Sequence, residues 1–179
     1  MDTAPNLVLV GPMGAGKTSI GKRLADRFGL AFRDSDREVE AHTGVPVATI
    51  FECEGEPGFR ERERATLATL LAGTGRVVAT GGGAVLDAGT RDLIRLHGFV
   101  VYLHVGLAEQ RERLARDRTR PLIAGGDRDA VLHRLATERG PLYAEVADLR
   151  FDTDGLGPVD ACMQLGHLLD ARWRRGAAA

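Results

Sequence analysis

The sequence predicts an α/β fold of three layers, in which helices cover both faces of a parallel β-sheet. Short apolar segments rich in β-branched residues alternate along the chain with longer segments whose apolar residues recur at helical spacing. The first apolar segment leads directly into a glycine-rich loop and then a helical pattern, which is the context of a phosphate-binding P-loop. Ligands of such sheets bind beyond the carboxyl ends of the strands, so we expect the functional residues to follow the strands.

Five short segments have the composition of strands and should form a five-stranded sheet. They cover residues 7–10, 30–32, 77–80, 99–103 and 149–152, and the second closes with an Arg-Asp-Ser-Asp run. The helical pattern after the first strand should end at Gly29. Further helical patterns cover about 44–72, 88–97, 107–116, 128–146 and 158–174. We expect the first of these to be two helices, because the turn at 54–57 interrupts it.

Composition bounds the classes of function. The chain has 179 residues, of which 44% are hydrophobic, so we expect one domain spanning residues 1–179. Its formal charge is −1, which provides no overall field to attract nucleic acid or an acidic lipid surface. The two cysteines lie far apart, and no apolar stretch is long enough to cross a membrane. These features predict a cytoplasmic protein without nucleic-acid or membrane partners.

The glycine-rich loop reads Gly-Pro-Met-Gly-Ala-Gly-Lys-Thr over residues 11–18. Glycines let backbone N–H groups approach phosphate oxygens, and the following helix start adds partial positive charge. We expect Lys17 to reach the β- and γ-phosphates and the Thr18 hydroxyl to bind Mg²⁺. An ordinary glycine-rich turn is the alternative, but one of only two lysines in the chain occupies the required position. The candidate nucleotide-binding residues here are Gly14, Ala15, Gly16, Lys17, Thr18 and Ser19.

Two carboxylates, Asp34 and Asp36, stand two residues apart at the end of the second strand. If the strand stays extended through them, both side chains point the same way, toward the P-loop. A kinase needs one carboxylate for Mg²⁺ and another to orient or deprotonate the acceptor hydroxyl, and we assign Asp34 and Asp36 to these roles. The alternative is that Asp36 caps a helix beginning at Arg37.

Further candidates are two arginines and a run of glycines. Arg60 lies in a charged helical segment, where it could join surface ion pairs or hold a substrate carboxylate bidentately. Arg139 precedes Pro141, which should interrupt the helix, so Arg139 could project toward a cleft or lie on the surface. The three glycines at 81–83 follow a buried strand, which favours close approach of their backbone to a ligand.

The stretch 111–127 runs from a helical pattern into an arginine-rich loop. We expect residues 115–127 to form a lid that delivers a guanidinium to the transferring phosphate, and Arg120, before Pro121, is the candidate. Arg113 lies about two helical turns earlier and could flank the adenine. An RNA-binding loop is the alternative, but acidic neighbours and the lack of interleaved aromatic residues disfavour it.

Taken in order, these motifs resemble those of the shikimate kinases, P-loop enzymes that transfer the γ-phosphate of ATP to the 3-hydroxyl of shikimate. The resemblance covers about residues 7–154. The matching segments are the loop at 11–18, Asp34-Ser35-Asp36, Gly55-Glu56 with Phe59-Arg60, Gly81-Gly82-Gly83-Ala84-Val85, Arg120-Pro121-Leu122, and Arg139 with Pro141-Leu142-Tyr143.

The resemblance implies a nucleoside monophosphate kinase-like P-loop NTPase fold with strand order 2-3-1-4-5, a substrate-binding arm at about 36–63, and a monomeric, cytoplasmic protein. It implies that Asp34 serves Mg²⁺ through water and that Asp36 binds the shikimate hydroxyls. It also implies that Arg60, steadied by Glu63, and Arg139 hold the substrate carboxylate, and that the Gly82 backbone contacts the substrate.

The sequence therefore predicts an ATP- and Mg²⁺-dependent shikimate kinase, in which Lys17 and Arg120 stabilise developing charge and Asp36 aligns the acceptor. Two alternatives stay open: a kinase for another small hydroxy acid such as gluconate, and a nucleotide-binding regulatory module without turnover. One departure from the family is the segment 152–157, which provides no basic residue for the adenine.

Overall fold

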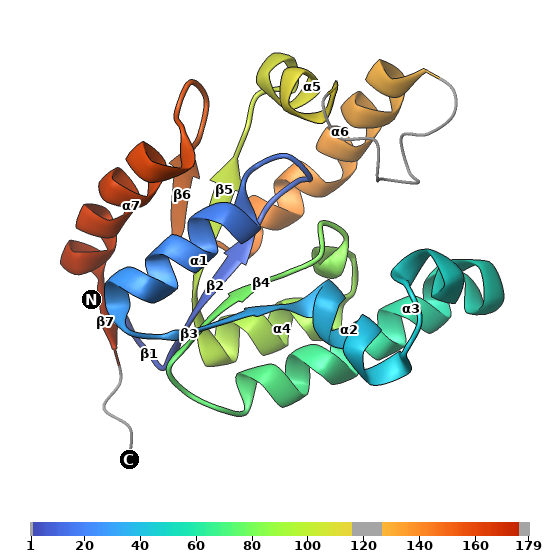
Figure 1. The fold of residues 1–179 in the computed structure, drawn as a ribbon, viewed down its shortest axis with the longest axis horizontal. Coiled ribbons are helices and arrows are strands. Elements are labelled where there is room, and N and C mark those ends of the chain that lie inside the picture. Colours follow the sequence, from blue (N-terminus) through green and yellow to red (C-terminus); the bar gives the residue numbers. More distant parts are fainter. Residues whose placement is uncertain (1, 116–126, 176–179) are drawn as a thin grey trace.

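The computed structural model describes residues 2–115 and 127–175, and these build a parallel sheet with helices on both faces (Figure 1). The five strands of the sheet lie in the order β3-β4-β2-β5-β6, which confirms the predicted order 2-3-1-4-5. Their bounds are β2 Asn6–Val10, β3 Ala31–Asp34, β4 Arg76–Ala79, β5 Gly98–His104 and β6 Leu149–Asp152. All neighbouring pairs are parallel, so the carboxyl ends of the strands meet at one edge.

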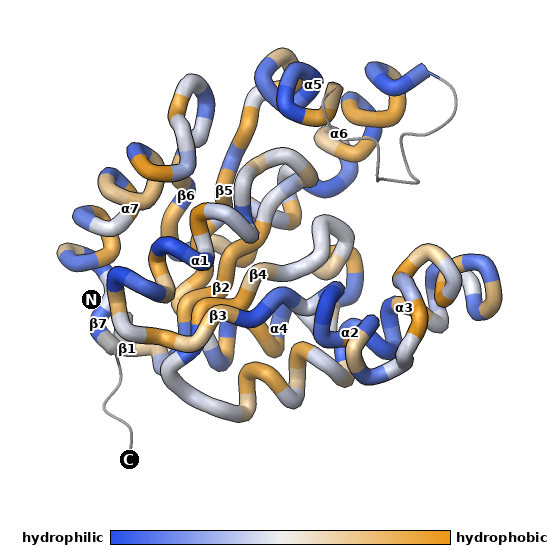
Figure 2. Tube along the Cα trace, viewed as in Figure 1, coloured by the Kyte–Doolittle hydropathy of each residue, from blue (hydrophilic) through white to orange (hydrophobic). Residues whose placement is uncertain are grey.

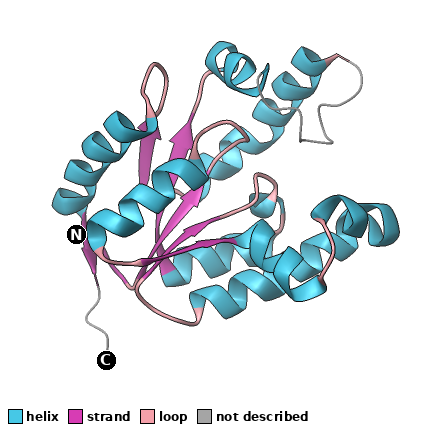
Figure 3. Cartoon of the chain, in the orientation of Figure 1, coloured by secondary structure: helices cyan, strands magenta, loops and turns pink. Residues whose placement is uncertain are grey.

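The helices divide between the two faces (Figure 3). Helices α1 (Lys17–Phe28) and α7 (Pro158–Arg172) contribute to the core on one face. On the other face the core is completed by α3 (Val47–Leu71), α4 (Ala88–His97) and α6 (Arg128–Val146). The remaining helical elements, α2 (Ser35–Thr43), α5 (Leu107–Ala115) and the 3₁₀ turn η1 (Ala84–Leu86), stand near the carboxyl ends of the strands.

The central strand β2 shows why this chain forms such a sheet. Leu7 and Leu9 point into the core of one face, and Val8 and Val10 point into the other. All four side chains are fully buried, and Figure 2 shows the central strands as the most hydrophobic part of the chain. A strand that is apolar on both faces is stable only when helices cover both, which is the three-layer arrangement predicted from the sequence.

A second, small sheet joins the two ends of the described chain and was not predicted. Strand β1 (Asp2–Ala4) pairs in parallel with β7 (Trp173–Arg175), so the helix expected to run to residue 174 ends at Arg172. The Trp173 indole donates a hydrogen bond to the Ala4 carbonyl over 3.0 Å and packs against Phe28 and Phe99. Burial of this large ring therefore overrides the helical pattern.

Two helices contain the irregularities that matter for the site. The expected break in the 44–72 pattern is confirmed, because Gly55 leaves helical geometry with φ 69° inside α3. The expected interruption of the helix at Pro141 is wrong, since α6 continues through it to Val146. Proline removes a single backbone donor, and tertiary packing of the residues around it keeps this helix continuous.

Within the described ranges, no helix is both long enough and apolar enough to span a lipid bilayer.

The packing of α1 on the sheet predicts a stability difference between two glycine substitutions. A methyl group at Gly21 would lie 2.7 Å from Phe32 Cε2 and 3.0 Å from Leu9 Cδ1, whereas one at Gly140 meets nothing within 4 Å. We expect Gly21→Ala to lower the free energy of unfolding by about 1–3 kcal/mol through overpacking. Gly140→Ala should raise it by roughly 0.5–1 kcal/mol through helix propensity. Urea unfolding of both variants checks this, and equal effects would contradict the described packing.

Candidate functional site

The P-loop follows β2 and runs into α1, whose first two residues are Lys17 and Thr18. Gly14 and Gly16 have φ of 79° and 90°, which side-chain-bearing residues rarely adopt. A methyl group at Gly11 would collide with the Leu103 carbonyl. The glycines are thus required by the path of the loop, which wraps a cavity of about 240 Å³. The lining residues are Gly14, Gly16, Lys17, Thr18, Ser19, Asp34, Asp36, Ala79, Thr80, Gly81 and Gly82.

Most of the predicted nucleotide-binding residues therefore border one cavity, and Ala15 lies buried within the loop itself. The Lys17 ammonium reaches back across the loop and donates to the carbonyls of Gly11, over 2.7 Å, and Pro12, over 2.8 Å. Lys17 is also the first residue of α1, where the helix carries partial positive charge. A fixed cation and a helix N-terminus at one cavity favour a polyanion such as a nucleotide phosphate chain.

Asp34 and Asp36 both border this cavity, but not as residues of one extended strand. Helix α2 begins at Ser35, and Asp34 is its N-cap, with its Oδ1 accepting from the Arg37 N–H over 3.4 Å. Both sequence interpretations are therefore corrected: the strand stops before Asp36, and the capping residue is Asp34. The buried Ser35 side chain accounts for the early helix start, since its Oγ accepts from the Gly81 N–H over 3.0 Å.

Asp34 and Thr18 provide a site that fits Mg²⁺. The Thr18 hydroxyl donates to Asp34 Oδ2 over 3.0 Å, so two oxygen ligands stand together at the phosphate cavity. Mg²⁺ prefers oxygen ligands and is usually held by one or two protein groups together with phosphates and water. The described residues contain no group of three His, Cys, Asp or Glu side chains that could hold a metal ion.

A second cavity, of about 180 Å³, adjoins the first. Asp36, Gly81 and Gly82 line both cavities, so the two meet at these residues. Burial raises the pKa of Asp36, and the neighbouring Asp34 carboxylate raises it further, while Lys17 and Arg60 act in the opposite direction. The other residues that line the second cavity are Met13, Val47, Phe51, Phe59, Arg60, Glu63, Gly83 and Arg139.

Arg60 and Arg139 bring two guanidinium groups to the second cavity from different helices. Arg60 is paired with Glu63 over 2.5 Å and with Glu56 over 3.2 Å, and only 16% of its side chain is exposed. Arg60 therefore makes ion pairs within its own helix, as one interpretation of the sequence predicted. It also lines the cavity, where it could hold a substrate carboxylate, as the other interpretation predicted. Arg139 is nine-tenths buried, which excludes the surface position, and its Nε has no partner among the described residues.

The three glycines after β4 line the second cavity and lie against these charged groups. A methyl group at Gly81 would lie 2.5 Å from Glu63 Oε1 and 2.7 Å from Asp36 Oδ1. At Gly83 it would collide with the Arg60 guanidinium. Side chains at these positions would displace the charges that border the cavity, so the run of glycines is a requirement of the site.

The sequence analysis missed the apolar wall of the second cavity, formed by Met13, Val47, Phe51 and Phe59. The rings of Phe51 and Phe59 lie 4.7 Å apart, on either side of the kink at Gly55. Apolar residues flanking a predicted helix break were the available signal. A wall of this kind suits a carbon ring held beside charged groups.

The two arginines predicted near the nucleotide have different outcomes. The Arg113 guanidinium connects the P-loop to the segment after β6, donating to Gly14 O over 3.1 Å and to Thr153 O over 2.6 Å. It also pairs with Glu109 over 2.9 Å. Arg120 and nearly all of the predicted lid at 115–127 lie outside the described residues.

Glu63 predicts a pH dependence of stability. Burial raises its pKa from 4.5 to about 7, with Arg60 opposing and Asp36 adding to the rise. Because the folded protein holds this proton more tightly than the unfolded chain, its contribution to stability is full below about pH 4.5 and is lost toward about pH 7. Glu63→Gln cannot titrate, so its free energy of unfolding should fall less over that interval, by up to roughly 3 kcal/mol.

Denaturant unfolding at several pH values provides the measurement. Glu56→Gln is the matched control, because Glu56 pairs with the same arginine but is 54% exposed, and it should keep the wild-type slope. A Glu63→Gln protein with that same slope would contradict the assignment.

Comparisons with known proteins agree with this geometry. The family model described as shikimate kinase matches residues 13–168. A shikimate kinase from Stenotrophomonas maltophilia is 56% identical over 98% of this chain and 97% of its own length. One from Xanthomonas campestris is 55% identical over 97% of each chain.

A solved structure, the shikimate kinase from Acinetobacter baumannii in complex with shikimate, superposes with a TM-score of 0.90 at 42% identity and covers 94% of both chains. The resemblance found in the motifs is thereby confirmed. The chain belongs to the shikimate kinase family, whose members are ATP-dependent phosphotransferases.

Proposed function

We propose that this protein transfers the γ-phosphate of ATP to the 3-hydroxyl of shikimate, giving shikimate 3-phosphate and ADP. The observation that carries the proposal is the meeting of two cavities at Asp36, Gly81 and Gly82. One has the fixed positive charge that a phosphate chain requires, and the other has two guanidinium groups and an apolar wall. The shikimate bound to the Acinetobacter baumannii relative supports shikimate as the acceptor.

On the nucleotide side, the P-loop N–H groups and Lys17 hold the β- and γ-phosphates. Thr18 and Asp34 hold Mg²⁺, with Asp34 acting directly or through water. When bound, the ion neutralises charge that develops on the phosphates during transfer. Lys17 adds a cation that is positioned before the reaction begins, so little reorganisation is needed in the transition state.

On the acceptor side, Arg60 and Arg139 bind the carboxylate and Asp36 accepts a hydrogen bond from the 3-hydroxyl. Asp36 lies between the cavities, so it can align the hydroxyl with the γ-phosphate. An uncharged acceptor would leave Arg139 Nε, which has no partner among the described residues, unsatisfied at about 1–3 kcal/mol, and would add no charge-assisted bond to Arg60. This difference is the proposed source of specificity for an acid.

Several predictions from the sequence remain proposals. Arg113 is expected near the adenine, and Arg120 is expected to stabilise the transferring phosphate from a lid. The single domain, the monomeric state and the cytoplasmic location also stay predictions.

The function is tested by coupled ADP release with shikimate and with gluconate as acceptors, each with and without a chelator of Mg²⁺. We expect rapid turnover with shikimate, little with gluconate, and none after Mg²⁺ removal. Equal rates with both acids would favour a kinase of broader or different specificity. ATP binding without turnover on either acid would favour a regulatory module.

The carboxylate clamp predicts a selective kinetic effect of Arg60→Ala. Loss of a charge-assisted pair should raise the KM for shikimate by roughly 10–100-fold, because such bonds contribute about 1.5–3 kcal/mol. The KM for ATP should stay nearly constant. Arg62→Ala is the control, since Arg62 lies on the same helix but pairs with Glu54 over 2.7 Å at the surface. Steady-state kinetics decides, and an unchanged KM for shikimate would remove Arg60 from the clamp.

A further inference from the structure

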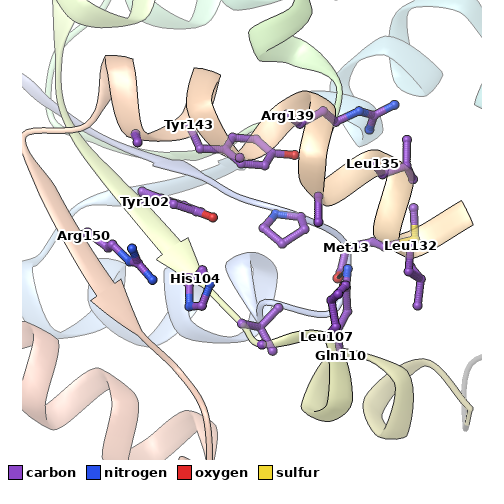
Figure 4. A pocket seen from close by; sticks show the side chains of 16 residues that line it. Met13, Tyr102, His104, Leu107, Gln110, Leu132, Leu135, Arg139, Tyr143 and Arg150 are labelled. Carbon is purple, nitrogen blue, oxygen red and sulfur yellow. Dashed lines mark hydrogen bonds between the residues drawn. The ribbon is translucent and has the colours of Figure 1, made fainter. Parts of the chain in front are cut away.

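Tyr143 reaches the glycine turn from the same helix that carries Arg139. Its side chain is 2% exposed, and its hydroxyl donates a hydrogen bond to the Gly82 carbonyl oxygen. Its ring packs against Tyr102 with centroids 5.2 Å apart. Figure 4 shows Tyr143 one turn beyond Arg139 on α6, with the two tyrosine rings side by side. The proposed function gives Tyr143 no role.

The hydrogen bonds of the turn decide which way its peptide groups face. The Gly81 carbonyl accepts from Ala84 over 3.1 Å, and the Gly83 carbonyl accepts from Leu86 over 3.0 Å. With the Gly82 carbonyl taken by Tyr143, all three glycine carbonyls are engaged. In a planar trans peptide the N–H points opposite to the carbonyl, so the Gly83 N–H faces away from Tyr143.

Gly82 and Gly83 line the substrate cavity and Tyr143 does not. This difference in lining indicates that the cavity lies on the side of the turn away from Tyr143. Within residues 2–115 and 127–175, the N–H groups of Gly82 and Gly83 have no protein acceptor. Both residues adjoin the clamp arginines, because a methyl group at Gly82 would lie 3.7 Å from Arg139 Nη1 and one at Gly83 would collide with the Arg60 guanidinium.

This orientation needs to be held, because the peptide joins two glycines. Glycine pays little steric penalty for large changes in φ and ψ, so such a peptide can flip. A flip would turn the Gly82 carbonyl oxygen toward the cavity and withdraw the Gly83 N–H. A carbonyl oxygen facing a bound carboxylate is repulsive, and the affinity of the cavity for an acid would fall.

The tyrosine ring belongs to the same core cluster as Ala84 and Val85, which follow the glycines, so the hydroxyl is held close to the turn. The ring also borders another cavity, of about 270 Å³, which Figure 4 shows between Tyr102, Leu107 and α6. The hydroxyl remains a donor over the ordinary pH range, because burial raises the pKa of Tyr143 to about 12. The positive charge of the Arg139 guanidinium partly offsets that rise in the pKa of Tyr143.

We propose that Tyr143 is a positioning residue that sets the polarity of the glycine turn, so that the substrate cavity presents N–H donors and no carbonyl oxygen to a carboxylate. This inference rests on the proposed function of that cavity as the site of an acidic substrate. Tyr143 itself lines neither the substrate cavity nor the phosphate cavity.

The test compares Tyr143→Phe with Tyr102→Phe. Both variants remove a hydroxyl from the same pair of neighbouring rings, and only the first removes the bond to Gly82. Tyr143→Phe should raise the KM for shikimate by roughly 10–100-fold, while the KM for ATP and kcat change little. Tyr102→Phe should leave all three constants near wild type. Thermal unfolding of both variants establishes that they are folded.

A spectroscopic measurement separates positioning from a general structural effect. In ¹⁵N–¹H spectra of the wild type, the amide signals of Gly82 and Gly83 should both shift downfield when shikimate is added, and in Tyr143→Phe the Gly83 shift should be lost. A wild-type Gly83 signal that ignores shikimate overturns the inference even if the variant does not fold. So does a Tyr143→Phe enzyme with wild-type KM. Failure of the wild type to turn over shikimate would count against the proposed function instead.

Discussion

The parallel pairing of β3, β4 and β2 is the constraint on which the site depends. Ala79 of β4 lies in register with Asp34 of β3 and with Leu9 of β2, so three chain reversals begin at the same level of the sheet. The P-loop, the start of α2 and the glycine turn therefore lie next to one another at the edge of the sheet. This proximity allows the hydrogen bonds between them, which include Thr18 to Asp34 and Gly81 to Ser35.

Much of this arrangement could be predicted from the sequence, because the determining features are local. Strand β2 is apolar on both faces and is followed by a glycine-rich loop and a helix. This pattern indicates that β2 lies in the centre of the sheet with the P-loop at its carboxyl end. The break at Gly55 and the end of α1 at Gly29 are confirmed for the same reason, since positive φ favours glycine. The alternation of elements then indicates which residues gather at the carboxyl ends of the strands.

The remaining features depend on contacts between distant residues. The start of α2 at Ser35 reflects a bond to Gly81, 46 residues away, and no local pattern reports it. The continuity of α6 through Pro141 reflects packing of Tyr143 and Val146 on the sheet. The pairing of Trp173 with the N-terminal strand likewise joins the two ends of the described chain. Sequence reasoning named Arg60 and Arg139 as the proposed clamp, but it did not establish how α6 brings Arg139 to the second cavity.

The balance of fixed charges around the glycine turn affects how the product leaves the second cavity. When ionised, the carboxylates of Asp36 and Glu63 roughly cancel the guanidinium groups of Arg60 and Arg139, all of which border the same space. A monoanionic acid, such as the proposed substrate, would enter without strong opposition. Phosphorylation adds about 1.5–2 negative charges to it at neutral pH, and these would develop close to Asp36. Mutual repulsion would then help to expel the ester, so a single set of side chains could favour both capture of the acid and its departure after reaction.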